Sequence, residues 1–282
     1  MNMPADLTVV ILSYNEEVNL PYALENVKGF AKEVVVLDSH STDRTVEIAE
    51  SFGARIYNRT FDDFSRQRKY ALEDIPYTSG WIFVLDADEH LTVSLKEEIR
   101  DTIDTTDKDA FFIKRRFYWK GKWIKRGYYP TWLLRLGRNG MITCDDRPIN
   151  EHLICINDNT GTLKEDFVDY NRKPLSDWIA KHNDYSDREA RQFFLREGAE
   201  ERYDFWASQY ERKRWVRVKV WNRMPPVFRP FLYFFYRYVL RLGFLDGKEA
   251  FMYHFLHAFL YRALIDFKYL ELRWKSRESD IS

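Results

Sequence analysis

The sequence has few of the residues and segments that mark several common protein classes. Its 282 residues include two cysteines, too few for a disulfide framework or a cysteine-rich zinc site. No G-x-G-x-x-G segment follows the first apolar run, which argues against a dinucleotide-binding fold, and the absence of G-x-x-x-x-G-K-[ST] argues against a P-loop NTPase. No apolar run reaches the ~20 residues of a membrane-spanning helix.

The net charge of the chain is zero because an acidic region and a basic region cancel each other. The chain has 44 basic and 44 acidic residues; residues 1–201 hold 28 and 36 of them, and residues 202–282 hold 16 and 8. Aromatic residues make up 17% of the chain, and they are concentrated between Tyr203 and Trp274. The length allows one large domain or two small ones. The charge asymmetry predicts that the basic region meets an anionic partner.

Short apolar runs alternate with amphipathic segments at the start of the chain. This alternation predicts βαβ units, and therefore an α/β fold with a mostly parallel sheet flanked by helices. The N-terminal apolar run is short and lacks a preceding basic segment, so we expect a first strand there instead of a signal peptide. The expected strands are residues 7–12, 33–37, 54–58 and 81–86, and the expected helices are 18–30, 43–53 and 65–75.

Polar segments follow three of the expected strands, where ligands of such a sheet bind. They are Ser13–Glu17, Asp38–Asp43 and Asp86–Glu89. Carboxylates repel phosphate, but they can hold it through Mg²⁺ or Mn²⁺. Asp86 and Asp88 are two residues apart, so on a continuing strand both would face one side. A D-x-D pair is common, and an ordinary polar turn is the alternative interpretation.

Four segments, in this order and spacing, resemble a known family. VVILSYNEE, VVVLDSHSTDRTVEIA, FSRQRKYAL and WIFVLDADEHL are similar to the inverting glycosyltransferases of family 2, which have the Rossmann-like GT-A fold. The resemblance implies transfer of a hexose, expected to be glucose, from a UDP-sugar. Looser matches, to the branch that glucosylates lipopolysaccharide core and related cell-envelope glycans, cover residues 127–138, 149–153, 177–190 and 229–251.

The resemblance assigns four residues to the donor. It implies that Tyr14 and Glu16 lie near the base and the ribose, and that Asp38 accepts a hydrogen bond from the base, usually uracil. It places Arg68 near the donor pocket. His40 stands where the family usually has glycine, so we expect that the turn after the second strand could differ.

The resemblance also implies a metal site and a general base. Asp86 and Asp88 would hold the ribose and the diphosphate with its bound Mn²⁺ or Mg²⁺, and Glu151 is the candidate base. Asn150 stands where this branch often has histidine. A metal neutralises charge on the diphosphate leaving group, and a carboxylate can take the proton of the attacking hydroxyl. No covalent intermediate is needed, and we find no Ser/His/Asp arrangement.

Cations and aromatic residues interleave between Arg115 and Tyr129. Aromatic faces stack on sugar rings and cations meet phosphates, so this stretch is a candidate for the acceptor site; a solvated basic loop is the alternative. We expect no nucleic acid, because no recognised nucleic-acid module accompanies the patch. The expected division is a GT-A catalytic domain over 1–200, with a nucleotide-sugar half to about 105 and an acceptor half from about 106, followed by a helical region over 201–282.

The basic, aromatic C-terminal region predicts helices that lie on an anionic membrane. We therefore expect a cytoplasmic protein, peripheral on the inner face of the cytoplasmic membrane, with a lipid-linked saccharide as acceptor. A helical subdomain or a dimer interface is the alternative for this region. For the whole chain, the rivals are a nucleotidyltransferase on a related sheet and a non-catalytic sugar-nucleotide-binding or membrane-scaffold protein.

Glu151→Gln tests the assignment of the base. Glutamine keeps the shape and hydrogen bonding of the side chain but cannot accept a proton. We expect normal binding of UDP-sugar by calorimetry and a fall in kcat of ~10²–10⁴-fold. Near-normal turnover of this variant, together with an inactive Asp145→Asn or Asp146→Asn variant, would show that another carboxylate is the base.

Overall fold

The structure, a computed structural model, describes residues 3–145, 152–195 and 224–279. The chain forms two compact units, Met1–Lys173 and Pro174–Ser282. The expected boundary after residue 200 lies outside the described residues and stays a prediction. Each unit is described by itself.

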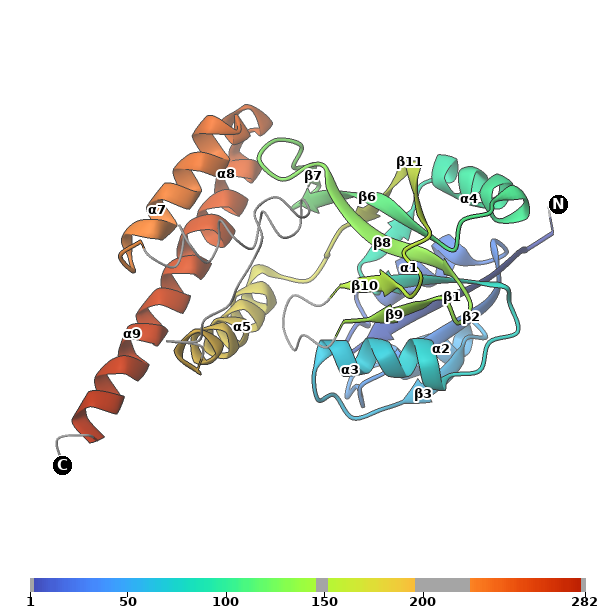
Figure 1. Cartoon of the computed structure of the whole chain (residues 1–282), viewed down its shortest axis with the longest axis horizontal. Helices are drawn as coiled ribbons and strands as arrows, with labels where there is room; N and C mark the ends of the chain where they lie inside the picture. The colour runs from blue at the N-terminus through green and yellow to red at the C-terminus, as the bar shows by residue number, and fades with distance from the viewer. Residues whose placement is uncertain (1–2, 146–151, 196–223, 280–282) are drawn as a thin grey trace. The chain divides into compact units, whose positions relative to one another are not determined.

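The described part of the first unit is built on a nine-stranded sheet (Figure 1). Its strand order is β3-β2-β1-β4-β8-β6-β11-β5, with β7 paired to β6, and β9 and β10 form a separate pair. The strands are β1 (Ala5–Ser13), β2 (Ala31–Asp38), β3 (Arg55–Asn58), β4 (Trp81–Asp86), β5 (Glu89–Leu91), β6 (Ala110–Trp119), β7 (Lys122–Trp123), β8 (Thr131–Arg138), β9 (Ile142–Cys144), β10 (Leu153–Cys155) and β11 (Thr160–Asp169). The helices are α1 (Leu20–Val27), α2 (Thr45–Ser51), α3 (Phe64–Lys69), its π-helical continuation η1 (Tyr70–Asp74), and α4 (Val93–Thr105).

The buried strand β1 shows why the sheet has layers on both faces. Val9 and Ile11 pack into one core with α1, α2 and α4, whereas Val10 packs into a second core with η1, β9 and β10. A strand covered on both faces needs apolar residues at every position, which explains the continuous run in the sequence. The expected α/β fold is confirmed.

The strand order brings three carboxyl ends together. β3, β2, β1 and β4 are parallel neighbours, as the alternating pattern predicts. In their registers Ser13 lies opposite Asp38, and Leu12 lies opposite Asp86. β8 runs antiparallel to β4 and β6, so the sheet is mixed beyond β4.

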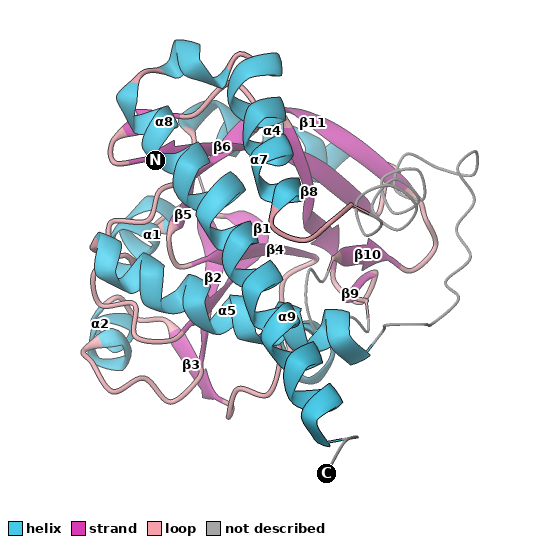
Figure 2. Ribbon diagram, turned by 90° about the vertical axis from the view of Figure 1, so that its left-hand side faces the viewer, coloured by secondary structure: helices cyan, strands magenta, loops and turns pink. Residues whose placement is uncertain are grey.

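Every described element of the second unit is a helix (Figure 2), which confirms the expected helical C-terminal region. The long helices α5 and α9 pack together around Ala190, Tyr261 and Ile265. None of the helices in the described ranges combines the length and apolar character needed to cross a bilayer. The elements are α5 (Leu175–Leu195), α7 (Phe228–Phe235), η3 (Tyr236–Leu240), η4 (Gly243–Asp246), α8 (Lys248–His254), η5 (Phe255–Leu260) and α9 (Tyr261–Ser279).

An aromatic cluster between α5 and α9 encloses His182. Its ring stacks on Trp178 with centroids 3.6 Å apart, and its edge meets Tyr261 at 5.0 Å. Its Nδ1 lies 2.8 Å from the carbonyl oxygen of Trp178. Burial lowers the pKa of His182 from 6.5 to about 4, and the positive charges of Lys181 and Arg262 add to that effect. The folded unit therefore holds His182 neutral.

We expect the free energy of unfolding to fall as pH decreases from about 6.5 to about 4. In that window the unfolded chain binds a proton at His182 and the folded chain does not, so acid favours unfolding, by up to about 1.4 kcal/mol per pH unit. His182→Gln can still hydrogen-bond but does not titrate, so it should flatten part of this slope in urea unfolding measured across pH. An unchanged slope would contradict the assignment.

Candidate functional site

Two turns at the carboxyl ends of β1 and β2 are hydrogen-bonded to each other. The Asn15 N–H donates to Ser41 Oγ at 2.8 Å, the Thr42 N–H donates to Asn15 Oδ1 at 2.8 Å, and the Glu16 N–H donates to Thr45 Oγ1 at 2.7 Å. Together these bonds make the two turns one polar platform at the edge of the sheet.

His40 adopts the backbone conformation that a glycine would favour. Its φ is 59°, in the left-handed region that side chains with a Cβ rarely enter. The position where the family resemblance expects glycine therefore keeps a glycine-like backbone, although histidine occupies it.

The Asp38 carboxylate is buried and holds the turn after β2. Oδ1 accepts from Ser13 Oγ at 3.0 Å and from Ser41 Oγ at 2.5 Å, and Oδ2 accepts from the Ser41 N–H at 2.7 Å. Through these bonds Asp38 links the end of β1 to the turn after β2, the two parts of the platform. The expected hydrogen bond from Asp38 to a nucleotide base stays a prediction.

Asp86, the last residue of β4, meets two arginines. Arg135 Nη2 lies 2.9 Å from Oδ2 of Asp86, and Arg68 Nη2 lies 3.1 Å from Oδ1. Arg68 comes from α3, and Arg135 comes from the middle of β8. The structure thus places Arg68 beside Asp86, as part of one charged group at this edge.

The D-x-D segment does not continue as a strand. β4 ends at Asp86, and Ala87 and Asp88 form a turn into β5. The alternation that would put Asp86 and Asp88 on one side of a strand therefore does not apply. The Asp88 carbonyl accepts from the Tyr170 N–H at 2.8 Å, which ties this turn to the end of β11.

Glu89 is a buried carboxylate that shares Arg135 with Asp86. Its Oε1 lies 2.6 Å from Arg135 Nη2, and its Oε2 accepts from the Asp86 N–H at 3.0 Å. Burial raises the pKa of Glu89 to about 8, Arg135 opposes the shift, and the charges of Asp86 and Asp169 reinforce it.

Asp169, at the end of β11, brings a further strand to the same edge. It pairs with Arg115 at 3.0 Å. Burial raises its pKa to about 7, Arg115 opposes the shift, and the charges of Asp88 and Asp86 reinforce it. Asp169 precedes Tyr170, whose N–H donates to the Asp88 carbonyl, so Asp88 and Asp169 lie at the same edge.

Glu16 completes the acidic group from the side of β1. Lys173 Nζ lies 2.7 Å from its Oε1, and Asn19 Nδ2 donates to its Oε2 at 2.8 Å. Burial raises the pKa of Glu16, and Asp88 adds to the rise, while Lys173 opposes it. Asp88 therefore acts electrostatically on both Glu16 and Asp169, between the ends of β1 and β11.

Of two further expected site residues, the structure describes Tyr14 and does not describe Glu151. Tyr14 is exposed at the end of β1, next to Glu16. Glu151, the expected base, lies outside the described residues. Nearby, Asp145 Oδ1 accepts from the His152 N–H at 3.1 Å, and the Asp145 carbonyl accepts from Ser65 Oγ.

Sequence reasoning missed Arg135 and Asp169 as members of the site. Arg135 is a lone cation between Leu134 and Leu136 in a strand, a pattern that indicates a buried ion pair. Asp169 directly follows apolar strand residues, as Asp86 does, and this shared pattern could have identified it. Within the described ranges, no cluster of three or more His, Cys, Asp or Glu side chains is arranged to hold a metal ion.

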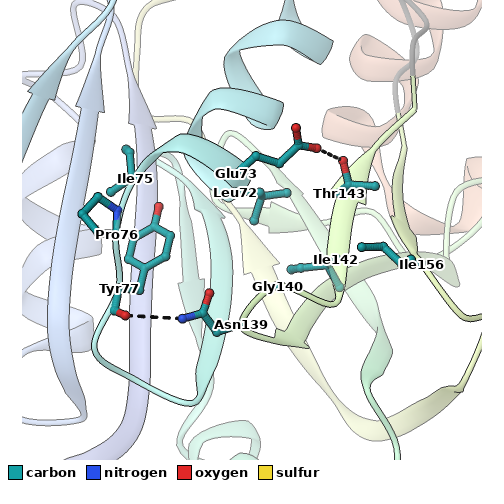
Figure 3. A pocket seen from close by; sticks show the side chains of 10 residues that line it. All are labelled: Leu72, Glu73, Ile75, Pro76, Tyr77, Asn139, Gly140, Ile142, Thr143 and Ile156. Atoms are coloured by element: carbon teal, nitrogen blue, oxygen red, sulfur yellow. Dashed lines mark hydrogen bonds between the residues drawn. The ribbon is translucent and has the colours of Figure 1, made fainter.

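A pocket of about 540 Å³ lies at the other edge of the sheet (Figure 3). It is lined by the segment before β4, including Pro76 and Tyr77, and by residues after β8 such as Asn139. Asn139 Nδ2 donates to the Tyr77 carbonyl at 3.4 Å. Because these residues are at the amino end of β4, the pocket does not include the acidic edge.

Comparison with known proteins decides the family. The model of glycosyl transferase family 2 matches residues 8–170, which include the acidic edge and the strands that build it. The chain belongs to this family. Both the family resemblance and the GT-A fold that it implies are confirmed.

Individual relatives match shorter parts. An uncharacterized glycosyltransferase of Rickettsia bellii is 34% identical over 105 residues, 37% of this chain and 35% of the relative. The lipopolysaccharide core biosynthesis glycosyltransferase LpsC of Rhizobium meliloti is 28% identical over 202 residues, 66% of this chain and 71% of LpsC. The chain spans only 35–43% of the first Rickettsia relatives that it matches.

Among solved structures, S. aureus TarS 1–349 in complex with UDP-GlcNAc covers 96% of this chain and 91% of its own. It is 14% identical to this chain, with a TM-score of 0.45.

Arg135→Met tests the central ion pair. It leaves Glu89 buried without its cation, so we expect a loss of about 3–5 kcal/mol in unfolding free energy, measured in urea at pH 9, above the pKa of about 8 at which Glu89 ionises in the folded protein. Arg68→Met should cost less, because Asp86 keeps Arg135. The exposed Arg66→Met, on the same helix as Arg68, is the control and should change little. A greater loss in Arg68→Met than in Arg135→Met would contradict this account.

Proposed function

We propose that this protein is an inverting hexosyltransferase that uses a UDP-sugar, with glucose the expected sugar. Its acceptor is a lipid-linked cell-envelope glycan such as lipopolysaccharide core, and the reaction needs Mn²⁺ or Mg²⁺. The observation that carries the proposal is that strand register and hydrogen bonds bring Glu16, Asp86, Asp88 and Asp169 to one edge of a family 2 domain.

Asp88 is the residue best suited to bind a divalent cation with the donor diphosphate. It raises the pKa of Glu16 and of Asp169, so a cation beside it would relieve repulsion among three carboxylates. Mg²⁺ in proteins often takes one or two carboxylates and fills its remaining positions with phosphate and water oxygens. Bound there, the cation would neutralise charge on the UDP leaving group.

Asp86 differs from Asp88 because two arginines already balance its charge. Arg135 and Arg68 donate to its two oxygens, so the carboxylate is held in one orientation. An oriented acceptor suits a hydrogen bond from a ribose hydroxyl. Asp38 and Glu16 would serve the base and the ribose from the neighbouring platform, with Tyr14 exposed beside them.

In the transfer step, an oxygen of the acceptor hydroxyl bonds to the anomeric carbon as the bond to the UDP oxygen breaks. The attack comes from the opposite face and inverts that carbon. The hydroxyl proton goes to Glu151, the proposed base, and UDP keeps the electron pair of the broken bond. One such displacement needs one base and no covalent enzyme intermediate.

The acceptor side of the proposal rests on the β6–β7 hairpin. Arg116 and Lys125 lie over the Trp123 ring, at 4.9 and 4.7 Å from its centroid. Arg116 also pairs with the buried Asp166 at 2.6 Å, so it has a structural role, whereas Lys120 and Lys122 are exposed near the hairpin tip. Exposed cations beside aromatic rings suit a phosphorylated saccharide. The similarity to LpsC favours a cell-envelope acceptor.

A donor screen that follows UDP release tests the reaction. With UDP-glucose, UDP-galactose and UDP-N-acetylglucosamine in Mn²⁺, we expect turnover that EDTA abolishes and Mn²⁺ or Mg²⁺ restores. Asp88→Asn should lower turnover on the order of 10²-fold or more without unfolding the protein. Asp101→Asn, an exposed carboxylate on α4, is the matched control and should be normal.

Two outcomes would contradict the proposal. Full activity in EDTA would contradict the assignment of a metal ion to the reaction. Binding of UDP-sugars without release of UDP, in the presence of metal and acceptor extract, would favour a non-catalytic sugar-nucleotide-binding protein.

A further inference from the structure

The helix formed by α7 and η3 turns apolar side chains toward solvent. Phe228, Leu232, Phe235 and Val239 are 69%, 53%, 50% and 37% exposed. Their spacing of four, three and four residues places them in one stripe along a helix. These four residues are called the outward stripe.

The inner side of the same helix carries a charge. Arg229 is 4% exposed and pairs with Asp266 of α9, with Nε 2.8 Å from Oδ1 and 2.9 Å from Oδ2. The Val227 N–H also donates to Asp266, at 3.0 Å. A helix on the surface of a water-soluble domain normally buries its apolar stripe and exposes its charges. Here an ion pair lies on the buried side, beside half-buried Phe234, while the apolar stripe is exposed.

Exposed apolar side chains continue beyond the outward stripe. Leu240 follows at the end of η3, and Phe244 and Leu245 lie in η4. α8 packs against η3 and η4, and α7 packs against η5, so these elements form one local group. Contiguous exposed apolar surface of this kind marks a binding surface for protein or membrane.

The charges around this surface have one predominant sign. Between Phe228 and Phe255, all of which the structure describes, Arg241 and Lys248 are exposed. Of the two acids in that range, Asp246 is buried and Glu249 is partly covered, 4.0 Å from Lys248. A surface that exposes lysine and arginine beside aromatic and aliphatic side chains is complementary to anionic lipid headgroups over acyl chains.

We propose that the outward stripe, with Leu240 and Leu245, docks on the interface of an anionic lipid bilayer. α7 and η3 together have 13 residues, ~20 Å of helix, which is shorter than the ~30 Å hydrocarbon core. The helix therefore lies in the interface plane, with its stripe among the upper acyl chains and Arg241 and Lys248 at the lipid phosphates. This deepens the proposed function by naming the surface that meets a lipid-linked acceptor.

A fluorescent label at residue 240 tests insertion directly. Leu240→Cys can be labelled selectively with an environment-sensitive dye, because native Cys144 and Cys155 are buried. With vesicles of phosphatidylglycerol we expect a blue shift and a rise in intensity. The same dye on Trp274→Cys, at a similarly exposed position of α9, should respond little.

Substitutions separate the apolar and the electrostatic parts. A triple variant should partition into phosphatidylglycerol vesicles more weakly, on the order of tenfold or more. It combines Leu232→Gln, Leu240→Gln and Leu245→Gln. The matched control combines Phe267→Gln with Trp274→Gln. It also removes exposed apolar side chains, and it should change partition into the same vesicles less than twofold. Arg241→Glu with Lys248→Glu should weaken binding to phosphatidylglycerol and leave the weak binding to phosphatidylcholine unchanged.

The outcomes distinguish this proposal from its rivals and from the proposed reaction. A blue shift that grows with protein concentration in the absence of vesicles would assign the surface to a second copy of the chain and overturn the lipid proposal. Unchanged partition of the triple leucine variant would also overturn it. UDP release from a soluble acceptor should be normal in that variant, so loss of lipid binding and loss of catalysis are measured separately.

Discussion

The buried guanidinium of Arg135 is the contact on which the acidic edge depends. It reaches from β8 to Asp86 and Glu89, at 2.9 and 2.6 Å, and so joins the end of β4 to the start of β5. Without this cation, the buried carboxyl of Glu89 would lie beside the partly exposed Asp86 carboxylate and would lose the charge that most strongly opposes the rise in its pKa. Arg135 holds both ends of the turn that carries Asp88, through Asp86 at the end of β4 and Glu89 at the start of β5.

Two further carboxylates, those of Glu16 and Asp169, lie at the same edge of the sheet. Glu16 and Asp169 both have raised pKa values, to which burial contributes most and Asp88 contributes repulsion. Such a group favours a proton or a cation in the folded protein. Lys173 and Arg115 pair with Glu16 and Asp169 individually and oppose the rise in their pKa values.

The second unit also contains a buried ion pair, and there the pair joins two helices. Arg229 and Asp266 are buried and stabilise each other, which holds α7 against α9 through a charged contact. The apolar stripe of α7 is then left on the outside. A buried bidentate pair has strict geometry, and it fixes the face of the helix that turns inward. This ion pair, together with the ring contacts of Phe234 with Phe251 and Phe255, accompanies the outward position of the stripe.

The sequence by itself determined the parallel core and the strand ends that carry polar residues, because a strand buried on both faces must be apolar throughout and its last residue shows where the ligand edge begins. Motif order indicated Asp38, Asp86 and Asp88, which the structure places at the end of β2, at the end of β4 and in the turn after it; their roles stay predictions. The sequence did not reveal that Asp86–Asp88 is a turn, that Asp38 is bonded to Ser13 and Ser41, or that Arg135 and Asp169 complete the site. Those facts depend on partners distant in the chain, such as β4 with β8, and only tertiary packing decides them. The orientation of α7 has the same origin: the sequence shows its apolar stripe, but contacts distant in the chain, such as Arg229 with Asp266 and Phe234 with Phe255, accompany its outward position.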